Sequence, residues 1–369
     1  PGEAHAAVVV KQLEDPQLRF AAVTALASFG HSVVEANAAA LVEKGLTDAD
    51  SQTRQLAAET LGAAGAAALP NCESQLLALL AHKLPGVRCA AALALGHIGE
   101  AARPHAAAVA ALLEDDAEDT SERHLQIGGG RPRLPPMVRR PKCAALQALA
   151  VMGASEHARD CAKALGDDSY EVRLCALECI ATFGDAGRVV STEVAACLED
   201  NTHVVRAKAC ECIAALAAED AMASLPELFS DKSPSVKCAA LYALATSPQV
   251  AETCSNEVVK CMSDVVPSVK AAAIYVLGNM GDVGCCYASA VAATLMDEDF
   301  GVRRAACEAL GHMGAYGAAF MDDISACLFS DDPTLAQTAQ AALDELSMAD
   351  GPSVGKKQML VDETNDQLE

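Results

Sequence analysis

The stretch Val302–Gly314, VRRAACEALGHMG, holds the pattern that decides the fold of this chain. An apolar residue and a base open the stretch, small residues recur through it, and glycine closes it. Similar stretches begin at nine further positions: Leu18, Thr53, Val87, Pro141, Val172, Val205, Val236, Val269 and, in a degenerate form, Leu335. Self-similarity therefore governs the whole chain.

The base at the second position of each copy gives the period of the repeat. Successive gaps between these bases, from Arg19 to Arg303, are 35, 34, 54, 31, 33, 31, 33 and 33 residues. Seven of the eight gaps lie near 33, which is typical of stacked hairpins that each bury a face against their neighbours. The single gap of 54 indicates an insertion in the fourth repeat.

Each copy predicts an amphipathic helix. Offsets 0, 4, 7, 8 and 11 from its first residue are apolar or small, and at about 100° per residue they form one stripe. The preceding segments carry a shorter helical stripe, as in STEVAACLED from Ser191. Each repeat is therefore predicted to be a first helix, a tight turn and a second helix.

Aspartates before the second helix and glycines after it are predicted to define its ends. We expect the aspartates to cap the helix by accepting hydrogen bonds from free backbone N–H groups; they are Asp15, Asp50, Asp168, Asp200, Asp231, Asp264, Asp299 and Asp332. Glycines after the helix supply the positive φ that ends it, as at Gly30, Gly65, Gly99 and Gly314.

These residues resemble the HEAT repeat, in the short Asp-x-x-x-Val-Arg-x-x-Ala-x-x-Ala-Leu-Gly form also seen in bilin lyases. The resemblance covers about residues 3–346 in ten copies that keep phase. It implies that the second helices line a concave face, and that the turn aspartate pairs with the base of a neighbouring repeat. Under this interpretation, the structural role of these charges is to join neighbouring repeats through ion pairs.

We therefore predict an all-α protein, a right-handed α-solenoid of about ten HEAT-like helical hairpins. The solenoid would span residues 1–346, with a loop insertion at about 115–140, followed by a polar C-terminal tail over 347–369. The last copy lacks the base and has polar Gln337, Thr338 and Gln340 at positions that are often apolar elsewhere. That polar surface suits a terminal repeat that caps the stack.

Composition excludes several functions. Formal charge is −23, from 50 acids against 27 Lys and Arg, and an acidic surface argues against nucleic acid as the main ligand. It would attract a basic partner. No apolar run reaches the roughly 18 residues that a membrane span requires, so we expect no membrane insertion.

Sixteen cysteines are predicted to be small buried hydrophobic residues, because none belongs to a CxxC pair of the kind that zinc sites use. Free buried cysteines indicate a reducing compartment such as the cytoplasm; an organelle lumen such as the plastid stroma stays open. His97 and His312 lie six repeats apart and are predicted to be surface or cap residues. No cofactor, metal or catalytic residue is predicted.

Offset six lies opposite the buried stripe and is predicted to face the inner groove. Along the array this offset gives Thr24, Glu59, Leu93, Gln147, Glu178, Glu211, Tyr242, Tyr275, Glu308 and Ala341. Two neighbouring tyrosines flanked by glutamates form a candidate binding strip, Glu178, Glu211, Tyr242, Tyr275 and Glu308, in which tyrosine supplies contact area and glutamate selects Lys or Arg. The alternative is a solvated helix face.

The insertion separates its charges, with six acids before six bases. It is either a solvated loop that partly neutralises itself or a recognition loop whose prolines favour an extended conformation. The candidate partner-binding residues of the loop are Arg123, Arg131, Arg133, Leu134, Pro135, Met137, Arg139 and Arg140. Long loops in compact arrays tend to be functional or disordered.

The sequence thus predicts a non-enzymatic scaffold or adaptor, a subunit of a larger assembly that binds other proteins through its groove and its Pro/Arg-rich insertion. No nucleophile elbow, Walker loop or dinucleotide fingerprint is present. Two alternatives stay open. One is a tetrapyrrole-binding protein, suggested by the bilin-lyase resemblance, and the other is a carrier of basic cargo, suggested by the charge.

Overall fold

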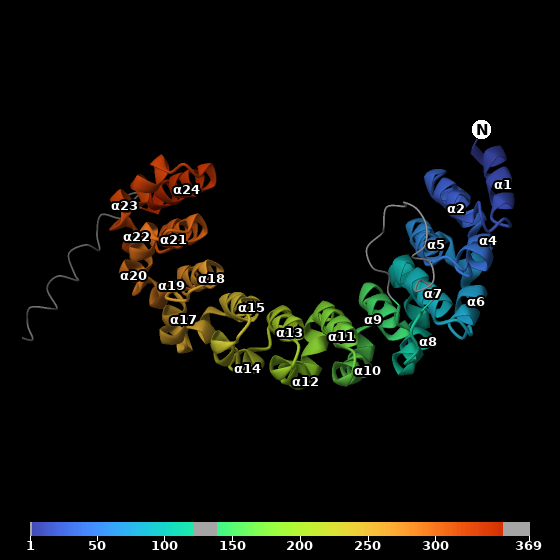
Figure 1. The fold of residues 1–369 in the computed structure, drawn as a ribbon, viewed down its shortest axis with the longest axis horizontal. Helices are drawn as coiled ribbons and strands as arrows, with labels where there is room; N and C mark the ends of the chain where they lie inside the picture. Colours follow the sequence, from blue (N-terminus) through green and yellow to red (C-terminus); the bar gives the residue numbers. More distant parts are fainter. Residues whose placement is uncertain (1, 121–138, 350–369) are drawn as a thin grey trace, which may run out of the picture. The chain divides into compact units, whose positions relative to one another are not determined.

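The computed structural model of the protein describes residues 2–120 and 139–349. Every regular element in these two ranges is helical, and the chain divides into two compact units, Pro1–Ala218 and Glu219–Glu369. The predicted all-α solenoid of about ten hairpins is confirmed (Figure 1). The domain boundaries predicted at 346 and 347 stay a prediction, and the last described helix ends at Ala349.

The second helices of the repeats are continuous and pack side by side within each unit. In the first unit they are α2 (Arg19–Ser28), α5 (Ser51–Ala64), α7 (Pro85–Ile98), α9 (Pro141–Val151), α11 (Tyr170–Thr182) and α13 (His203–Ala215). In the second unit they are α15 (Pro234–Ala245), α18 (Pro267–Gly278), α21 (Phe300–His312) and α24 (Pro333–Ala349).

The first helices form the other layer and, apart from α1 and α6, are broken into short pieces (Figure 1). In the first unit the helices of this layer are α1 (Gly2–Gln12), α3 (His31–Ala36), α4 (Ala38–Ala40), α6 (Leu69–Leu79), α8 (Ala106–Ala110), α10 (Ala158–Lys163) and α12 (Ser191–Ala196). In the second they are α14 (Glu219–Met222), α16 (Pro248–Thr253), α17 (Ser255–Cys261), α19 (Gly281–Cys285), α20 (Ala288–Ala293), α22 (Ala315–Ala318) and α23 (Met321–Ala326).

In most first helices, short 3₁₀ turns precede or follow the α-helical segment. The prediction of one uninterrupted first helix in the fourth repeat is therefore wrong. There, 3₁₀ turns Gly99–His105 and Ala111–Glu114 flank α8, and Pro104 lies inside the first of them. The other 3₁₀ turns are Gly65–Ala67, Ser155–His157, Ala164–Gly166, Gly184–Val190, Cys197–Glu199, Leu225–Ser230, Thr294–Met296 and Cys327–Phe329, and Leu41–Gly45 is π-helical.

The buried stripe of the second helices matches the predicted offsets. In α11 these are Val172, Ala176, Cys179, Ile180 and Phe183, all buried. Offset five is buried as well, a position that the predicted stripe left out; its residues are Val23, Ala58, Ala92, Leu146, Leu177, Cys210, Leu241, Ile274 and Cys307. The stripe is wider because each second helix packs against neighbouring second helices and also against its own first helix.

The glycines that follow the second helices have the predicted positive φ, 96° at Gly30 and 62° at Gly65. Ala217 occupies the same position after α13 and has φ 47°, the one positive value of a non-glycine residue in the described ranges. An alanine there is strained because its Cβ crowds the backbone in this conformation.

A ladder of ion pairs joins successive repeats within each unit, as the resemblance implies. Arg173 Nε lies 2.7 Å from Asp200 Oδ2 of the next repeat, and Arg173 Nη1 donates to the Asp167 carbonyl of its own turn. We call each such pair a rung. The corresponding rungs are Arg19–Asp48, Arg88–Asp115, Lys142–Asp167, Lys237–Asp264 and Lys270–Asp297.

The prediction that the turn aspartates cap the second helices holds at Asp50, Asp299 and Asp332, which accept from the N–H groups of Thr53, Val302 and Leu335. It is wrong for the aspartates of the rungs. Asp200, for example, precedes the first helical residue by three positions and accepts from the N–H of Thr202, which closes the turn. Its carboxylate is thereby aimed at the base of the preceding repeat instead of at the helix end.

Candidate functional site

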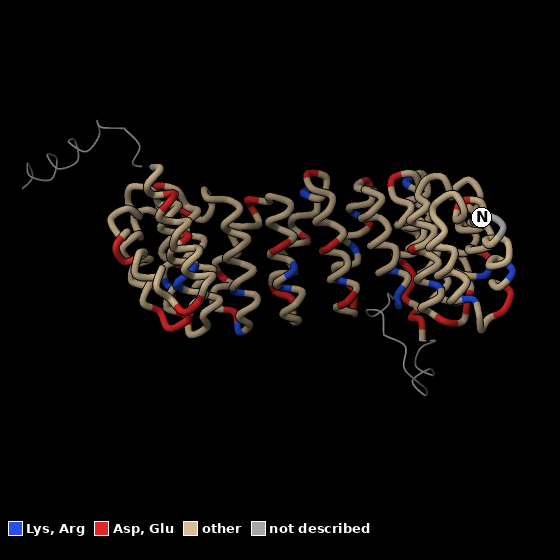
Figure 2. Tube along the Cα trace, turned by 90° about the horizontal axis from the view of Figure 1, so that it is seen from above, with Lys and Arg blue, Asp and Glu red and all other residues tan. Residues whose placement is uncertain are grey.

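The offset-six residues define an open surface, which we call the second-helix face. All ten are exposed or partly exposed, as predicted from the opposite position of the buried stripe. The two units contribute different side chains to this face: three glutamates, one glutamine, a threonine and a leucine in the first unit, and a tyrosine pair, a glutamate and an alanine in the second. Acidic residues are spread over both units and outnumber the bases (Figure 2).

In the first unit, two glutamates of the predicted strip meet a lysine. Lys208 Nζ lies 2.7 Å from Glu211 Oε2 and 3.6 Å from Glu178 Oε1 of the neighbouring helix α11. The hydrogen bond to Glu211 raises the pKa of Lys208 despite partial burial. The groove prediction named the glutamates and missed this lysine, which shows that the two carboxylates are spaced to hold an ammonium group.

In the second unit, Tyr242 of α15 and Tyr275 of α18 form an edge-to-face pair with ring centroids 5.7 Å apart. Their exposed fractions are 50% and 37%, so much of both rings faces solvent. Burial raises the pKa of Tyr242, and the nearby Tyr275 and Glu308 raise it further, which keeps the hydroxyl protonated at neutral pH. The strip thus offers aromatic area with an O–H donor beside a carboxylate.

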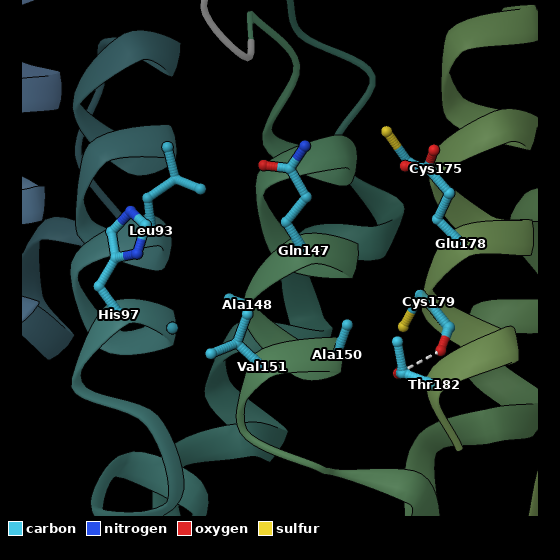
Figure 3. A pocket seen from close by; sticks show the side chains of 11 residues that line it. Leu93, His97, Gln147, Ala148, Ala150, Val151, Cys175, Glu178, Cys179 and Thr182 are labelled. Atoms are coloured by element: carbon cyan, nitrogen blue, oxygen red, sulfur yellow. Dashed lines mark hydrogen bonds between the residues drawn. The ribbon is translucent and has the colours of Figure 1, made fainter. Parts of the chain in front are cut away.

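A pocket of about 300 Å³ opens on the first unit between α7, α9 and α11 (Figure 3). Its lining is Leu93, Gly96 and His97 from α7, Gln147, Ala148, Ala150 and Val151 from α9, and Cys175, Glu178, Cys179 and Thr182 from α11. Three of these residues, Leu93, Gln147 and Glu178, belong to the predicted groove positions.

The two pocket cysteines are unsuited to nucleophilic chemistry. A hydrogen bond with Cys143 and burial raise the pKa of Cys175. Cys179 Sγ lies 3.8 Å from Cys161 Sγ, and that contact together with burial raises the pKa of Cys179. Thiols rather than thiolates are therefore present at neutral pH, and thiols are weak nucleophiles and weak metal ligands.

The described part of the insertion is tied to the array at both ends. Arg140, one of the predicted loop residues, pairs with Glu118 at 3.2 Å and contacts Glu171 at 3.7 Å. The Arg139 carbonyl accepts from the N–H of Asp119 at 2.7 Å. The other predicted loop residues, Arg123, Arg131, Arg133, Leu134, Pro135 and Met137, lie outside the described residues.

One rung of the ladder is made by the insertion itself. The base of the second repeat, Arg54, pairs with Asp119, although the regular partner would lie six residues before Arg88. That position holds His82, whose Nδ1 accepts from the N–H of Leu84 and so closes the turn as an aspartate would. A Cβ added at Gly86 would meet Asp119 and Arg54, so the glycine leaves room for this contact.

A family model described as HEAT repeats matches residues 39–125. This segment is built from HEAT repeats, and the rest of the described chain repeats the same helical hairpin. Among solved structures, importin beta matches 94% of this chain and 52% of its own length, with TM-score 0.68 and 13% identity. A Kap121p mutant matches over 95% and 42%, with TM-score 0.64 and 12% identity. This chain spans about half the length of these structures, and the likeness concerns the fold. A comparison with curated proteins finds no match.

Sequence reasoning missed several residues of these HEAT repeats that shape the candidate site. His97 is exposed, as predicted, but it also lines the pocket. Val151 is 60% exposed at the pocket rim, where the apolar stripe gave no reason to expect it. Among the described residues, no three His, Cys, Asp or Glu side chains are placed to hold a metal ion.

Proposed function

We propose that this HEAT-repeat chain is a non-enzymatic scaffold, a subunit of a larger assembly that binds other proteins through its second-helix face and its insertion. HEAT-repeat solenoids commonly mediate protein–protein interactions and are typically non-enzymatic. Each hairpin contacts only its neighbours, so a stack presents a long surface with many variable positions. A partner protein rather than a small substrate suits such a surface.

The exposed Tyr242–Tyr275 pair is the observation that carries this proposal. Tyrosine is enriched at the centres of protein interfaces, because it buries a large area and keeps a hydrogen-bonding hydroxyl. A ring that was only structural would be buried within the repeat, whereas these two rings contact each other on the surface. Glu308 beside them favours a partner that presents Lys or Arg.

The charge of the chain supports basic segments on the partner. The net charge of −23 attracts such segments over several ångströms, and the Glu178–Lys208–Glu211 cluster shows that this face accommodates an ammonium group. A carrier of basic cargo is the variant of the function that rests most on charge, and its binding would weaken steeply with added salt. The same charge disfavours nucleic acid as a partner.

A comparative affinity capture tests the proposal. The full chain and its Tyr242→Ala, Tyr275→Ala double variant are immobilised, and proteins retained from an extract of the source cells are identified by mass spectrometry. Tyr316→Ala is the matched control, because Tyr316 is 57% exposed but lies in the first-helix layer. We expect a set of proteins that the control retains and the double variant loses. Equal retention by all three would contradict binding through the tyrosine pair.

Two further findings bear on where such a scaffold acts. Twelve of the sixteen cysteines are buried, and none forms a disulfide; the proposed setting is a reducing compartment, because buried thiols persist there unpaired. Among the described helices, none combines the length and the hydropathy needed to cross a bilayer.

A further inference from the structure

The pocket between α7, α9 and α11 has a floor set by close helix packing. A Cβ on Gly96 would lie 2.7 Å from Ala148 Cα, so glycine is the residue that lets α7 and α9 approach this closely. The small side chains of Ala148 and Ala150 leave the space above that contact unfilled. The depression is therefore built into the packing of the fourth repeat against its neighbours.

Its size and lining favour a side chain over a cofactor. At about 300 Å³ it lies at the lower end of the range for small-molecule sites, which suits one or two apolar side chains better than a tetrapyrrole. The walls are mostly apolar, with Leu93 and Val151 presenting methyl groups at the opening. An apolar group that enters would lose its contact with water against a mostly apolar wall, which is favourable.

One side of the pocket rim carries an acidic residue. Glu178 stands on the α11 side with a 50% exposed side chain, and neither Lys nor Arg lines the pocket. Lys208 contacts Glu178 from α13, but its shorter contact is with Glu211, so one face of the Glu178 carboxylate is open to a cation from a ligand. Because Glu178 itself lines the pocket, neighbouring side chains on one face of a bound helix can reach the pocket and this carboxylate together.

We propose that this pocket receives an apolar side chain from a helical segment of a partner protein, and that the same segment presents Lys or Arg to Glu178. This inference rests on the proposed function and specifies the partner: an amphipathic basic helix whose apolar anchor enters a preformed cavity. The three observations that support it are the apolar cavity, its glycine-dependent floor and its single charged rim residue.

The chain contains no tryptophan, so a single introduced indole reports binding at a chosen place. Thr182 is exposed and lines the pocket, which makes Thr182→Trp the reporter. Ala341→Trp, at an exposed alanine of the last repeat, is the control reporter. The probe is a helical peptide of leucine and lysine, and a peptide with glutamate in place of lysine is its charge control.

We expect the leucine–lysine peptide to shift the emission of the Thr182→Trp protein and not that of the Ala341→Trp protein. Filling the pocket with Ala150→Phe, in the reporter background, should weaken binding about 10- to 100-fold, because one buried Leu side chain is then lost. Glu178→Gln should weaken it about 2- to 5-fold, as for an exposed ion pair. The glutamate peptide should bind more weakly than either variant binds the lysine peptide.

Undiminished binding to the Ala150→Phe protein, or equal binding of both peptides, would overturn the proposal. Should Ala150→Phe fail to fold, as judged by its helical circular dichroism, Val151→Asn gives a second test, because it removes apolar contact at the pocket without adding a charge and its exposed side chain contributes little to the core. The affinity capture with the Tyr242 and Tyr275 variant tests partner binding by the second unit and does not depend on the pocket. A negative peptide result with a positive capture rejects the pocket alone, whereas two negative results reject the scaffold function.

Discussion

Arg54 and Asp119 lie 65 residues apart in the sequence and form a nearly buried ion pair. The Arg54 side chain is only 4% exposed, and its Nη1 also donates to the carbonyls of Asp48 and Ala49. Asp119 therefore takes the place of the turn aspartate that the third repeat lacks. The insertion is joined to the ladder of the array and is not simply appended to its edge.

Removing this carboxylate should destabilise the first unit. Asp119→Asn removes the carboxylate from a nearly buried ion pair, a change that costs about 3–5 kcal/mol in other buried pairs; the contacts that Arg54 retains should reduce this to about 2–3 kcal/mol. His82→Asp should restore most of the loss, because residue 82 holds the position from which the other rungs are made. Urea unfolding of the two single variants and the double variant gives the coupling energy.

A coupling energy near zero in that cycle would show that residue 82 and Asp119 do not compete for Arg54. Asp264→Asn is the reference, since the Lys237–Asp264 rung is regular and its loss should cost less than the loss of Asp119.

The period and the buried stripe were predictable because they depend only on local spacing. Val302, Ala306, Ala309, Leu310 and Met313 are buried in the structure at the offsets that the sequence indicated. The ends of the second helices were also predictable where glycine follows, because a positive φ requires it.

The partners of the charges were not predictable from one repeat. Asp48 and Asp50 are the same residue type two positions apart, yet Asp48 pairs with Arg19 and Asp50 caps α5. Asp119 could not have been found by period, because it lies inside the insertion. The sequence did contain a signal for this contact. His82 stands where most other repeats have the aspartate of a rung, so the regular acidic partner of Arg54 is missing, which indicates that a carboxylate from elsewhere in the chain takes its place. The pocket depends on how three helices pack, which side-chain spacing does not specify.

Ala217→Gly should stabilise the protein. Alanine at φ 47° is strained, and glycine relieves the strain. Glycine also raises the conformational entropy of the unfolded chain, which offsets part of the gain. The net gain should be about 0.5–1 kcal/mol, measured as a higher urea midpoint. Gly184→Ala is the matched control, because Gly184 ends α11 at φ 52° with no atom within 4 Å of an added Cβ. It should lose about 1 kcal/mol through the backbone alone; a gain there would contradict the interpretation.

Acid should weaken the ladder. The hydrogen bond from Lys237 lowers the pKa of Asp264 below its ordinary 3.8, and a bond from the N–H of Val266 adds to this against the opposing effect of burial. A carboxylate with a lowered pKa in the folded state stabilises the fold above about pH 4, and this stabilisation is lost as the pH falls through the lowered pKa.

The melting temperature of the Asp264→Asn variant should therefore lie below that of the unmodified chain at pH 7 and approach it near pH 3. Asp282→Asn, at an exposed residue, should match the unmodified chain at both pH values. A gap that is as wide at pH 3 as at pH 7 would mean that Asp264 acts through packing and not through its charge.

Lys208→Ala should strengthen the binding of a basic partner. Lys208 occupies the space between Glu178 and Glu211, so a ligand cation must share Glu178 with it. Removing the lysine frees both carboxylates at a small cost in stability, about 0–1 kcal/mol for a partly exposed pair. We expect the leucine–lysine peptide to bind about 2- to 5-fold more tightly, with a steeper dependence on salt. Weaker binding would instead show that the stem of Lys208 supports the contact surface. Lys163→Ala, which removes another partly paired lysine of the first unit, should leave the affinity unchanged.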